Sequence, residues 1–174
     1  DWEIDKELIL RLPNLVVIAT TSTGDSHIDT ATLKNSGKWL VKLERGDRGL
    51  EEITATVELS VALITGMQTG LLRIGRLLEN KSSSLNFTRD LQLSSSRIGL
   101  IGAGRIGERV GVALDALGCS IRFHEIAQDR RDEVKRSHAN WEHASLESIF
   151  ETSNLVSIHA SESCPPHPVV TSTL

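Results

Sequence analysis

The chain has 174 residues, a net charge of −4 and a pI near 5.9, with 39% hydrophobic and 24% charged residues. These values suit one globular domain, or one domain and part of another. The acidic balance and an aromatic content of 3% argue against nucleic acid or an anionic membrane as a partner. No apolar run reaches the roughly 18 residues that span a bilayer, and no signal-peptide pattern opens the chain, so we expect a cytoplasmic protein.

The first part of the chain alternates helical and strand patterns. Residues 1–11 have apolar positions at helical spacing. The continuous apolar run 15–19 predicts a strand that is buried on both faces, as in a parallel sheet. This strand leads into the small polar loop Ser22-Thr23-Gly24. Ligands bind at such strand ends in open α/β sheets, so the loop is a candidate binding site.

Three further elements follow before the middle of the chain. A helix is expected from Ile28 to Lys34, with Asp29 or Thr30 as its N-cap, and a strand from Trp39 to Leu43. The longest helical pattern runs from 54 to 78, and the serine-rich stretch after it predicts a loop or hinge.

A strand, a glycine turn and a helix come next, and they carry the strongest motif. The strand Arg97–Ile101 runs into Gly102, Gly104 and Gly107, which match the dinucleotide-binding pattern G-x-G-x-x-G. The first glycine permits the tight turn, the second lets the backbone approach a pyrophosphate, and the third lets the helix pack on the strand. The helix that follows is expected to end at Leu117.

The next strand, expected over 120–126, carries an acid where a dinucleotide site needs one. Glu125 lies 21 residues after Gly104, where a carboxylate accepts hydrogen bonds from the adenosine ribose and repels a 2′-phosphate. This position favours NAD over NADP, although Arg122, Arg130 and Arg131 lie near it in the sequence. A bare βαβ unit without a ligand is the alternative interpretation.

The remaining candidates are weaker. The charged segment 129–136 is expected to form a solvated helix without a partner, before a short helix at 146–151 and a strand at 155–159. Cys119 is expected to be a small buried residue rather than a reactive thiol. His138 and His143 are expected to be solvated, whereas His124 packs and His27 is a candidate lining residue. No histidine or cysteine spacing predicts a metal site, and no catalytic residue is assigned.

Four segments together resemble the D-isomer-specific 2-hydroxyacid dehydrogenase family. They are LPNLVVIATTSTGDSHID at 12–29, TATVELSVALI at 54–64, GLIGAGRIG at 99–107, and the weaker match from Ser145 to His159. Their order and spacing match the family as well, so the resemblance covers nearly the whole chain and is more specific than any single motif.

The resemblance implies a two-domain α/β protein of which this chain is a part. Residues 1–53 would be part of a flavodoxin-like substrate domain. Residues 54–82 would be an interdomain helix and hinge, and we expect homodimer contacts along 54–78. Residues 83–174 would be part of a Rossmann-like, NAD-binding parallel sheet.

The resemblance also implies roles for individual residues. Backbone N–H groups of Ser22, Thr23 and Gly24 would bind the carboxylate of a 2-hydroxy or 2-oxo acid. Besides Gly102, Gly104 and Gly107, the cofactor-binding residues would be Arg105 and Ile106 at the pyrophosphate, Glu125 at the ribose, and Ala160 beside the cofactor.

This sequence departs from the family where catalysis occurs. The catalytic arginine, its supporting glutamate and the acid–base histidine of the family match no residue here, and Ser161 stands where a proline is usual. The leading hypothesis is therefore the NAD-binding portion of an oxidoreductase that acts on the CH–OH group of a D-2-hydroxy acid, inactive as this chain alone. The alternative is a non-enzymatic NAD(H)-binding or interaction protein of the same fold, such as a corepressor-like protein or a decayed paralogue.

Overall fold

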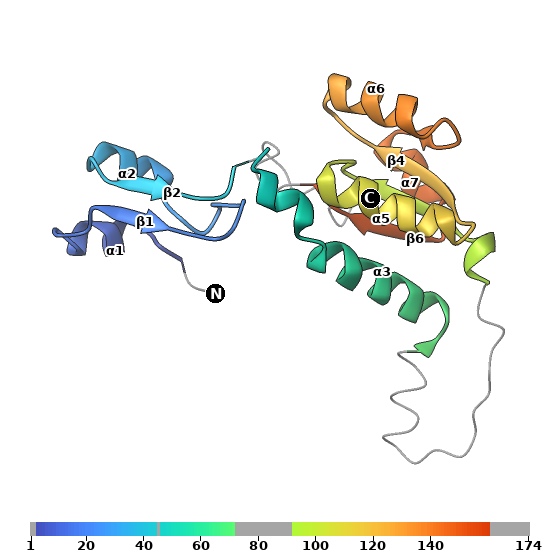
Figure 1. Cartoon of the computed structure of the whole chain (residues 1–174), viewed down its shortest axis with the longest axis horizontal. Coiled ribbons are helices and arrows are strands. Elements are labelled where there is room, and N and C mark those ends of the chain that lie inside the picture. The colour runs from blue at the N-terminus through green and yellow to red at the C-terminus, as the bar shows by residue number, and fades with distance from the viewer. Residues whose placement is uncertain (1–2, 45, 72–91, 161–174) are drawn as a thin grey trace, which may run out of the picture. The chain divides into compact units, whose positions relative to one another are not determined.

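The chain forms two compact units that divide between Ile53 and Thr54 (Figure 1). A computed structural model describes residues 3–44, 46–71 and 92–160. Unit 1 below means the described residues up to 53, and unit 2 means 54–71 with 92–160. The expected hinge after residue 78 and the tail beyond Ala160 lie outside the described residues.

Unit 1 is a small parallel α/β unit. Asp29 caps its second helix by accepting the Thr32 N–H at 2.9 Å, which confirms one of the two expected caps. Its elements are α1 (Lys6–Arg11), β1 (Val17–Ala19), α2 (Thr30–Asn35), β2 (Trp39–Val41) and the 3-10 helix η1 (Arg48–Glu52).

The strand β1 is buried on one face only, so the expectation of a strand buried on both faces is wrong. β1 pairs in parallel with β2, and Ile18 packs with Leu40 against a core that includes Ile9. Val17, which alternates to the other face, is 46% exposed. The described sheet of unit 1 has two strands, and its core lies on one side, which is why an apolar run does not imply burial here.

Unit 2 contains a four-stranded parallel sheet in the order β5-β4-β3-β6. The strands are β3 (Arg97–Ile101), β4 (Ser120–His124), β5 (Glu142–His143) and β6 (Leu155–Ile158). The helices are α3 (Ala55–Gln68), the 3-10 helix η2 (Leu93–Ser95), α5 (Arg105–Ala116), α6 (Gln128–Ser137) and α7 (Leu146–Thr152).

Helices cover both faces of this sheet, and the central strand β3 contacts both layers. Gly111 of α5 has no room for a Cβ, because the Trp141 ring and the Leu100 side chain of β3 occupy that space. On the opposite face, Gly99 of β3 lies against Ile149 of α7. These close approaches let α5 and α7 pack tightly on β3, and the glycine turn begins where β3 ends.

The helix α3 ends earlier than the sequence pattern predicts. The apolar repeat continues to residue 78, but α3 stops at Gln68. Gly70 follows with a φ of +70°, a left-handed conformation in which glycine commonly terminates helices. The predicted continuation over 72–78 lies outside the described residues.

Candidate nucleotide-binding site

Two glycines of the turn after β3 are required by packing. Gly102 has a φ of +89°, and a Cβ there would lie 2.7 Å from the backbone nitrogen of Ala160. A Cβ on Gly107 would overlap the carbonyl oxygen of Gly102. The turn therefore fits between the start of α5 and the residues after β6 only when both positions lack side chains.

The middle glycine faces open space instead. Gly104 is the N-cap of α5, and an added Cβ would meet no atom within 4 Å. No side chain caps the helix at this position. Amides in the first turn of a helix have no acceptor within the helix, and together they attract anions. The start of α5 therefore has open space beside Gly104 for a group that accepts hydrogen bonds from backbone amides.

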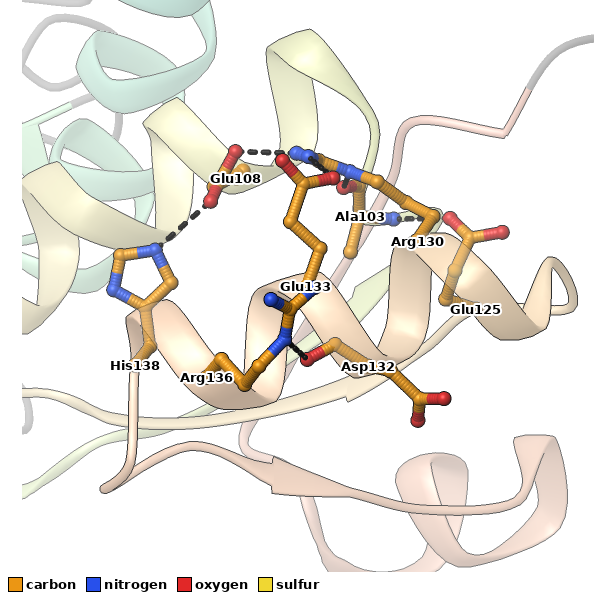
Figure 2. Close-up of polar contacts among 8 residues, drawn as sticks. All are labelled: Ala103, Glu108, Glu125, Arg130, Asp132, Glu133, Arg136 and His138. Carbon is orange, nitrogen blue, oxygen red and sulfur yellow. Dashed lines mark hydrogen bonds and ion pairs between the residues drawn. The ribbon is translucent and has the colours of Figure 1, made fainter.

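An acidic side chain from the end of β4 contacts the glycine turn. One carboxylate oxygen of Glu125, Oε2, accepts the N–H of Ala103 at 3.0 Å, and Oε1 accepts the N–H of Ala127 at 3.0 Å. Figure 2 shows this carboxylate beside Ala103. The fold thus brings together an acid and a glycine turn that are 22 residues apart in the sequence.

A charged cluster holds the other side of Ala103 (Figure 2). Arg130 of α6 donates from Nε to the Ala103 carbonyl oxygen at 2.8 Å. Its two terminal nitrogens bond to the carboxylates of Glu133, at 2.7 Å, and Glu108. The second Glu108 oxygen lies 3.0 Å from Nε2 of His138. The cluster thus connects the glycine turn with the first turn of α5, with α6 and with the segment after α6.

The carbonyl end of β6 completes the surroundings of the turn. The His159 N–H donates to the Ile101 carbonyl at 2.7 Å, and Ala160 packs against Gly102. Burial lowers the pKa of His159, whose Nε2 lies 2.9 Å from Oγ of Ser157. His159 is therefore a neutral ring near pH 7, packed beside the glycine turn.

The loop Ser22-Thr23-Gly24 belongs to unit 1 and is exposed. Its shape comes from its own side chains: Oγ of Ser22 accepts the Gly24 N–H at 3.0 Å, and Oγ1 of Thr20 accepts the Ser22 N–H at 3.2 Å. Next to the loop, Asp25 pairs with Lys42 at 2.6 Å, and this hydrogen bond lowers the pKa of Asp25.

The described residues contain neither a candidate metal site nor a candidate membrane-spanning helix. In residues 3–44, 46–71 and 92–160, no group of three or more His, Cys, Asp or Glu side chains could hold a metal ion. Within the same described ranges, no helix has the length and apolar character needed to cross a membrane.

A comparison with protein families gives these features an evolutionary context. Residues 61–168 match the profile of the D-isomer specific 2-hydroxyacid dehydrogenase, NAD binding domain. The chain belongs to this family. The match includes the glycine turn, Glu125 and Arg130.

Relatives in this dehydrogenase family extend the comparison to nearly the whole chain. A glyoxylate reductase of Thermofilum pendens is 29% identical over 161 residues, which are 90% of this chain and 45% of that protein. A glyoxylate/hydroxypyruvate reductase of Arabidopsis thaliana is 24% identical over 169 residues, which are 96% of this chain and 49% of that protein. The chain thus spans about half the length of the curated relatives it matches.

Solved structures of dehydrogenases agree with the fold. A D-lactate dehydrogenase from Aquifex aeolicus, complexed with NAD and lactic acid, superposes with a TM-score of 0.72 at 26% identity. That alignment covers 91% of this chain and 45% of the Aquifex chain.

Sequence reasoning missed several contacts in and near the glycine turn. The segment 129–136 was expected to be solvated, yet the side chain of its Arg130 is 25% exposed and bonds to the glycine turn. His138 was expected to be solvated but stacks on Trp141, with ring centroids 4.1 Å apart. His143 lies edge-on to Phe123 at 5.4 Å, and burial lowers its pKa. The mixture of acidic and basic residues in α6 was the one signal that could have suggested a charge network.

The structure also shows the surroundings of Cys119, Arg122 and His124. Cys119 is buried, and burial raises the pKa of its thiol, as a structural cysteine requires. Arg122 does not face the glycine turn, because it pairs with Glu142 of β5 and with Thr152 of α7. His124 stacks on His143, which confirms the packing role expected for it.

Proposed function

We propose that unit 2 binds NAD(H), as the first part of a Rossmann-like domain, in an oxidoreductase that acts on the CH–OH group of a D-2-hydroxy acid. Unit 1 would then be part of a flavodoxin-like substrate domain. The observation that carries the proposal is the hydrogen bond from the Ala103 N–H to Glu125, which joins the glycine turn to an acid suited to a ribose. The parallel order β5-β4-β3-β6 supports the same conclusion.

Each part of the glycine turn would have a separate task. The open side of Gly104 would admit the pyrophosphate, and the amides of Arg105 and Ile106 would donate to it. Glu125 would accept hydrogen bonds from the adenosine ribose, and Ala160 would lie beside the cofactor. The bound nicotinamide would supply the hydride acceptor or donor, which no side chain provides.

The substrate would be a small 2-hydroxy or 2-oxo acid. Two relatives are named for the reduction of glyoxylate or of glyoxylate and hydroxypyruvate, which are acids of this class. The loop Ser22-Thr23-Gly24 would bind its carboxylate through backbone N–H groups, and those of Ser22 and Gly24 would first have to leave the side-chain oxygens that they bond to within the loop. We propose that residues 1–174 alone do not turn over substrate. Reduction of a 2-oxo acid needs a cation that binds the carboxylate and a proton donor for the new hydroxyl group, and no residue of this chain matches the family's catalytic arginine or acid–base histidine.

Titration of NADH with the purified chain tests the nucleotide site. Gly104→Ala places a methyl group in the space reserved for the phosphates, so we expect NADH to bind at least about tenfold more weakly with an unchanged melting temperature. Gly49→Ala is the matched control, since a Cβ at Gly49 also meets no atom within 4 Å. A folded chain that does not bind NADH would contradict the proposal.

A second assay concerns turnover. The purified chain is mixed with NADH and either glyoxylate or hydroxypyruvate, and the absorbance of NADH is followed. We expect no oxidation above the rate without protein. Substrate-dependent oxidation by a sample free of other dehydrogenases would contradict the proposed inactivity, while leaving the nucleotide site supported.

We also propose that α3 contributes to a homodimer. Three apolar side chains at a spacing of four residues are exposed along α3: Leu59 (61%), Leu63 (48%) and Met67 (59%). An apolar stripe of this kind favours burial against another surface. Sedimentation velocity should show a dimer for the unmodified chain and a monomer for Leu63→Glu, and a monomeric unmodified chain would contradict this proposal.

A further inference from the structure

We propose that Glu108 determines which nicotinamide dinucleotide this chain accepts, by holding Arg130 so that it cannot serve a 2′-phosphate. The inference rests on the proposed NAD(H) site and goes further, because it assigns the choice between NAD(H) and NADP(H) to a residue outside the glycine motif. Glu125 is the obvious discriminating group, but an arginine next to it would oppose its effect.

Arg130 and Glu125 hold the same residue of the glycine turn. Glu125 accepts the N–H of Ala103, and Arg130 donates to the carbonyl oxygen of Ala103. The carboxylate and the guanidinium therefore hold the two polar backbone groups of a single residue, one its N–H and the other its carbonyl oxygen. A 2′-phosphate on a ribose bound at Glu125 would arrive beside Arg130, the type of side chain that accommodates this group in NADP sites.

Each of the three nitrogens of Arg130 already makes a hydrogen bond. Its Nε bonds to Ala103, and its two terminal nitrogens bond to Glu133 and Glu108. One positive charge thus faces two negative charges, so the cluster has an excess of one negative charge before Glu125 is counted. A phosphate with a charge of about −2 would be repelled here rather than attracted.

Glu108 is the stronger of the two restraints. Its side chain is 23% exposed, compared with 55% for Glu133, so water weakens its attraction to Arg130 less. Its other oxygen is fixed by His138, whose ring stacks on Trp141. Glu133, by contrast, lies three residues from Arg130 on the same exposed helix face, where such pairs contribute little.

The test compares the dissociation constants of NADH and NADPH for the full chain, by fluorescence titration. Glu108→Gln keeps the shape of the side chain and removes its charge. We expect it to raise NADPH affinity relative to NADH about tenfold, since one charge-assisted bond to Arg130 is weakened. Glu133→Gln is the matched control, because it removes the same charge from the exposed partner, and we expect about twofold or less.

A double variant shows whether the effect passes through Arg130. In an Arg130→Met background, Glu108→Gln should change the ratio of the two dissociation constants by about twofold or less, because no guanidinium is left to release and only the direct repulsion between Glu108 and the phosphate is removed. Persistence of the tenfold shift in that background would overturn the inference. So would an unchanged ratio in the single Glu108→Gln variant.

Two further outcomes remain distinguishable. If Glu108→Gln does not fold, as judged by circular dichroism, Glu108→Asp replaces it. Its shorter side chain cannot hold Arg130 and His138 together, and we expect a smaller shift in the same direction. An unchanged ratio in Glu108→Asp would then overturn the inference.

If the unmodified chain is folded and binds neither dinucleotide, the proposed function itself fails. If it binds NADH and the variants do not change the ratio, only this inference fails.

Discussion

The two loops that follow β1 and β3 differ in what determines their shape. Both come after the carboxyl end of a parallel strand, where α/β proteins bind ligands. The loop after β1 is exposed and is shaped by Thr20 and Ser22, each of which bonds to a backbone N–H two residues away. The turn after β3 is held by Glu125 and Arg130, which come from 22 and 27 residues away.

The loop after β1 is thus held by local hydrogen bonds, whereas the turn after β3 is held by tertiary contacts. The hydrogen bonds that shape the loop Ser22-Thr23-Gly24 lie within residues 20–24, so they do not depend on the rest of the fold. The carboxylate-binding role proposed for this loop therefore depends on groups outside it. The glycine turn exists only where α5, β4, α6 and the end of β6 converge on it. Substitutions should therefore have large and cooperative effects at the glycine turn and small, local effects at the serine loop.

The largest effect is expected for Gly107→Ala. The new methyl group would overlap the Gly102 carbonyl oxygen, a backbone atom that cannot rotate away. We expect a loss of about 3 kcal/mol or more of the free energy of unfolding, and loss of NADH binding. Urea denaturation measures the first and fluorescence titration the second. A fall in the free energy of unfolding of less than about 1 kcal/mol would show that the turn after β3 tolerates a side chain at Gly107, which would contradict its dependence on tertiary packing.

A core substitution in unit 1 tests whether its small core is local. Ile9 is fully buried in α1, and Ile9→Ala should cost about 3 kcal/mol. Hydrogen exchange should accelerate over residues 3–53 more than over β3 and β4. Leu10→Ala, on the same helix at a 58% exposed side chain, is the matched control and should change stability by about 0.5 kcal/mol or less. Equal acceleration in both units would contradict the expectation.

The pH dependence of stability should reflect His159. Burial lowers its pKa in the folded chain, whereas the unfolded chain has an ordinary value of about 6.5. Between these two values the unfolded chain binds more protons, so stability should fall as pH decreases below about 6.5 and level off below the folded pKa.

His159→Gln should therefore reduce the loss of stability between about pH 7.5 and about pH 5.5, as urea denaturation at each pH would measure. A residual slope is expected from His143, whose pKa burial also lowers. His27→Gln, at an exposed position, is the control. Identical slopes for the unmodified chain and His159→Gln would rule out a neutral, buried His159.

The smallest effect is expected for Ser22→Ala. It removes the acceptor of the Gly24 N–H, but water can replace that acceptor at an exposed loop, so stability should change by about 0.5 kcal/mol or less. Ser145→Ala makes the same chemical change at the N-cap of α7 and should cost about 1 kcal/mol. Thermal denaturation of both variants compares them directly. A larger loss at Ser22 than at Ser145 would show that the loop is not autonomous.

The sequence predicted those features that backbone geometry alone dictates. Gly102 and Gly107 could be recognised because a left-handed turn and a close approach admit no side chain, whatever the surroundings. The strand β3 and the N-cap Asp29 of α2 were likewise predicted from local pattern. The position of Glu125 could be inferred because a βαβ unit fixes which strand ends lie side by side.

Features that depend on distant side chains were not predictable. The contact of Arg130 with Ala103 needs the packing of α6 beside α5, and no local spacing encodes it. The exposure of Val17 depends on how many layers cover the sheet. The end of α3 was missed because the apolar repeat continues past Gly70, whereas the positive φ of this glycine ends the helix.

The double anchoring of Ala103 has a kinetic consequence. Its N–H and its carbonyl are each held by a charged side chain, so the turn is ordered when the chain folds rather than when a nucleotide arrives. A preorganised loop loses little conformational entropy on association. Dinucleotide capture at this site is therefore expected to follow simple one-step kinetics, without a slow isomerisation after encounter.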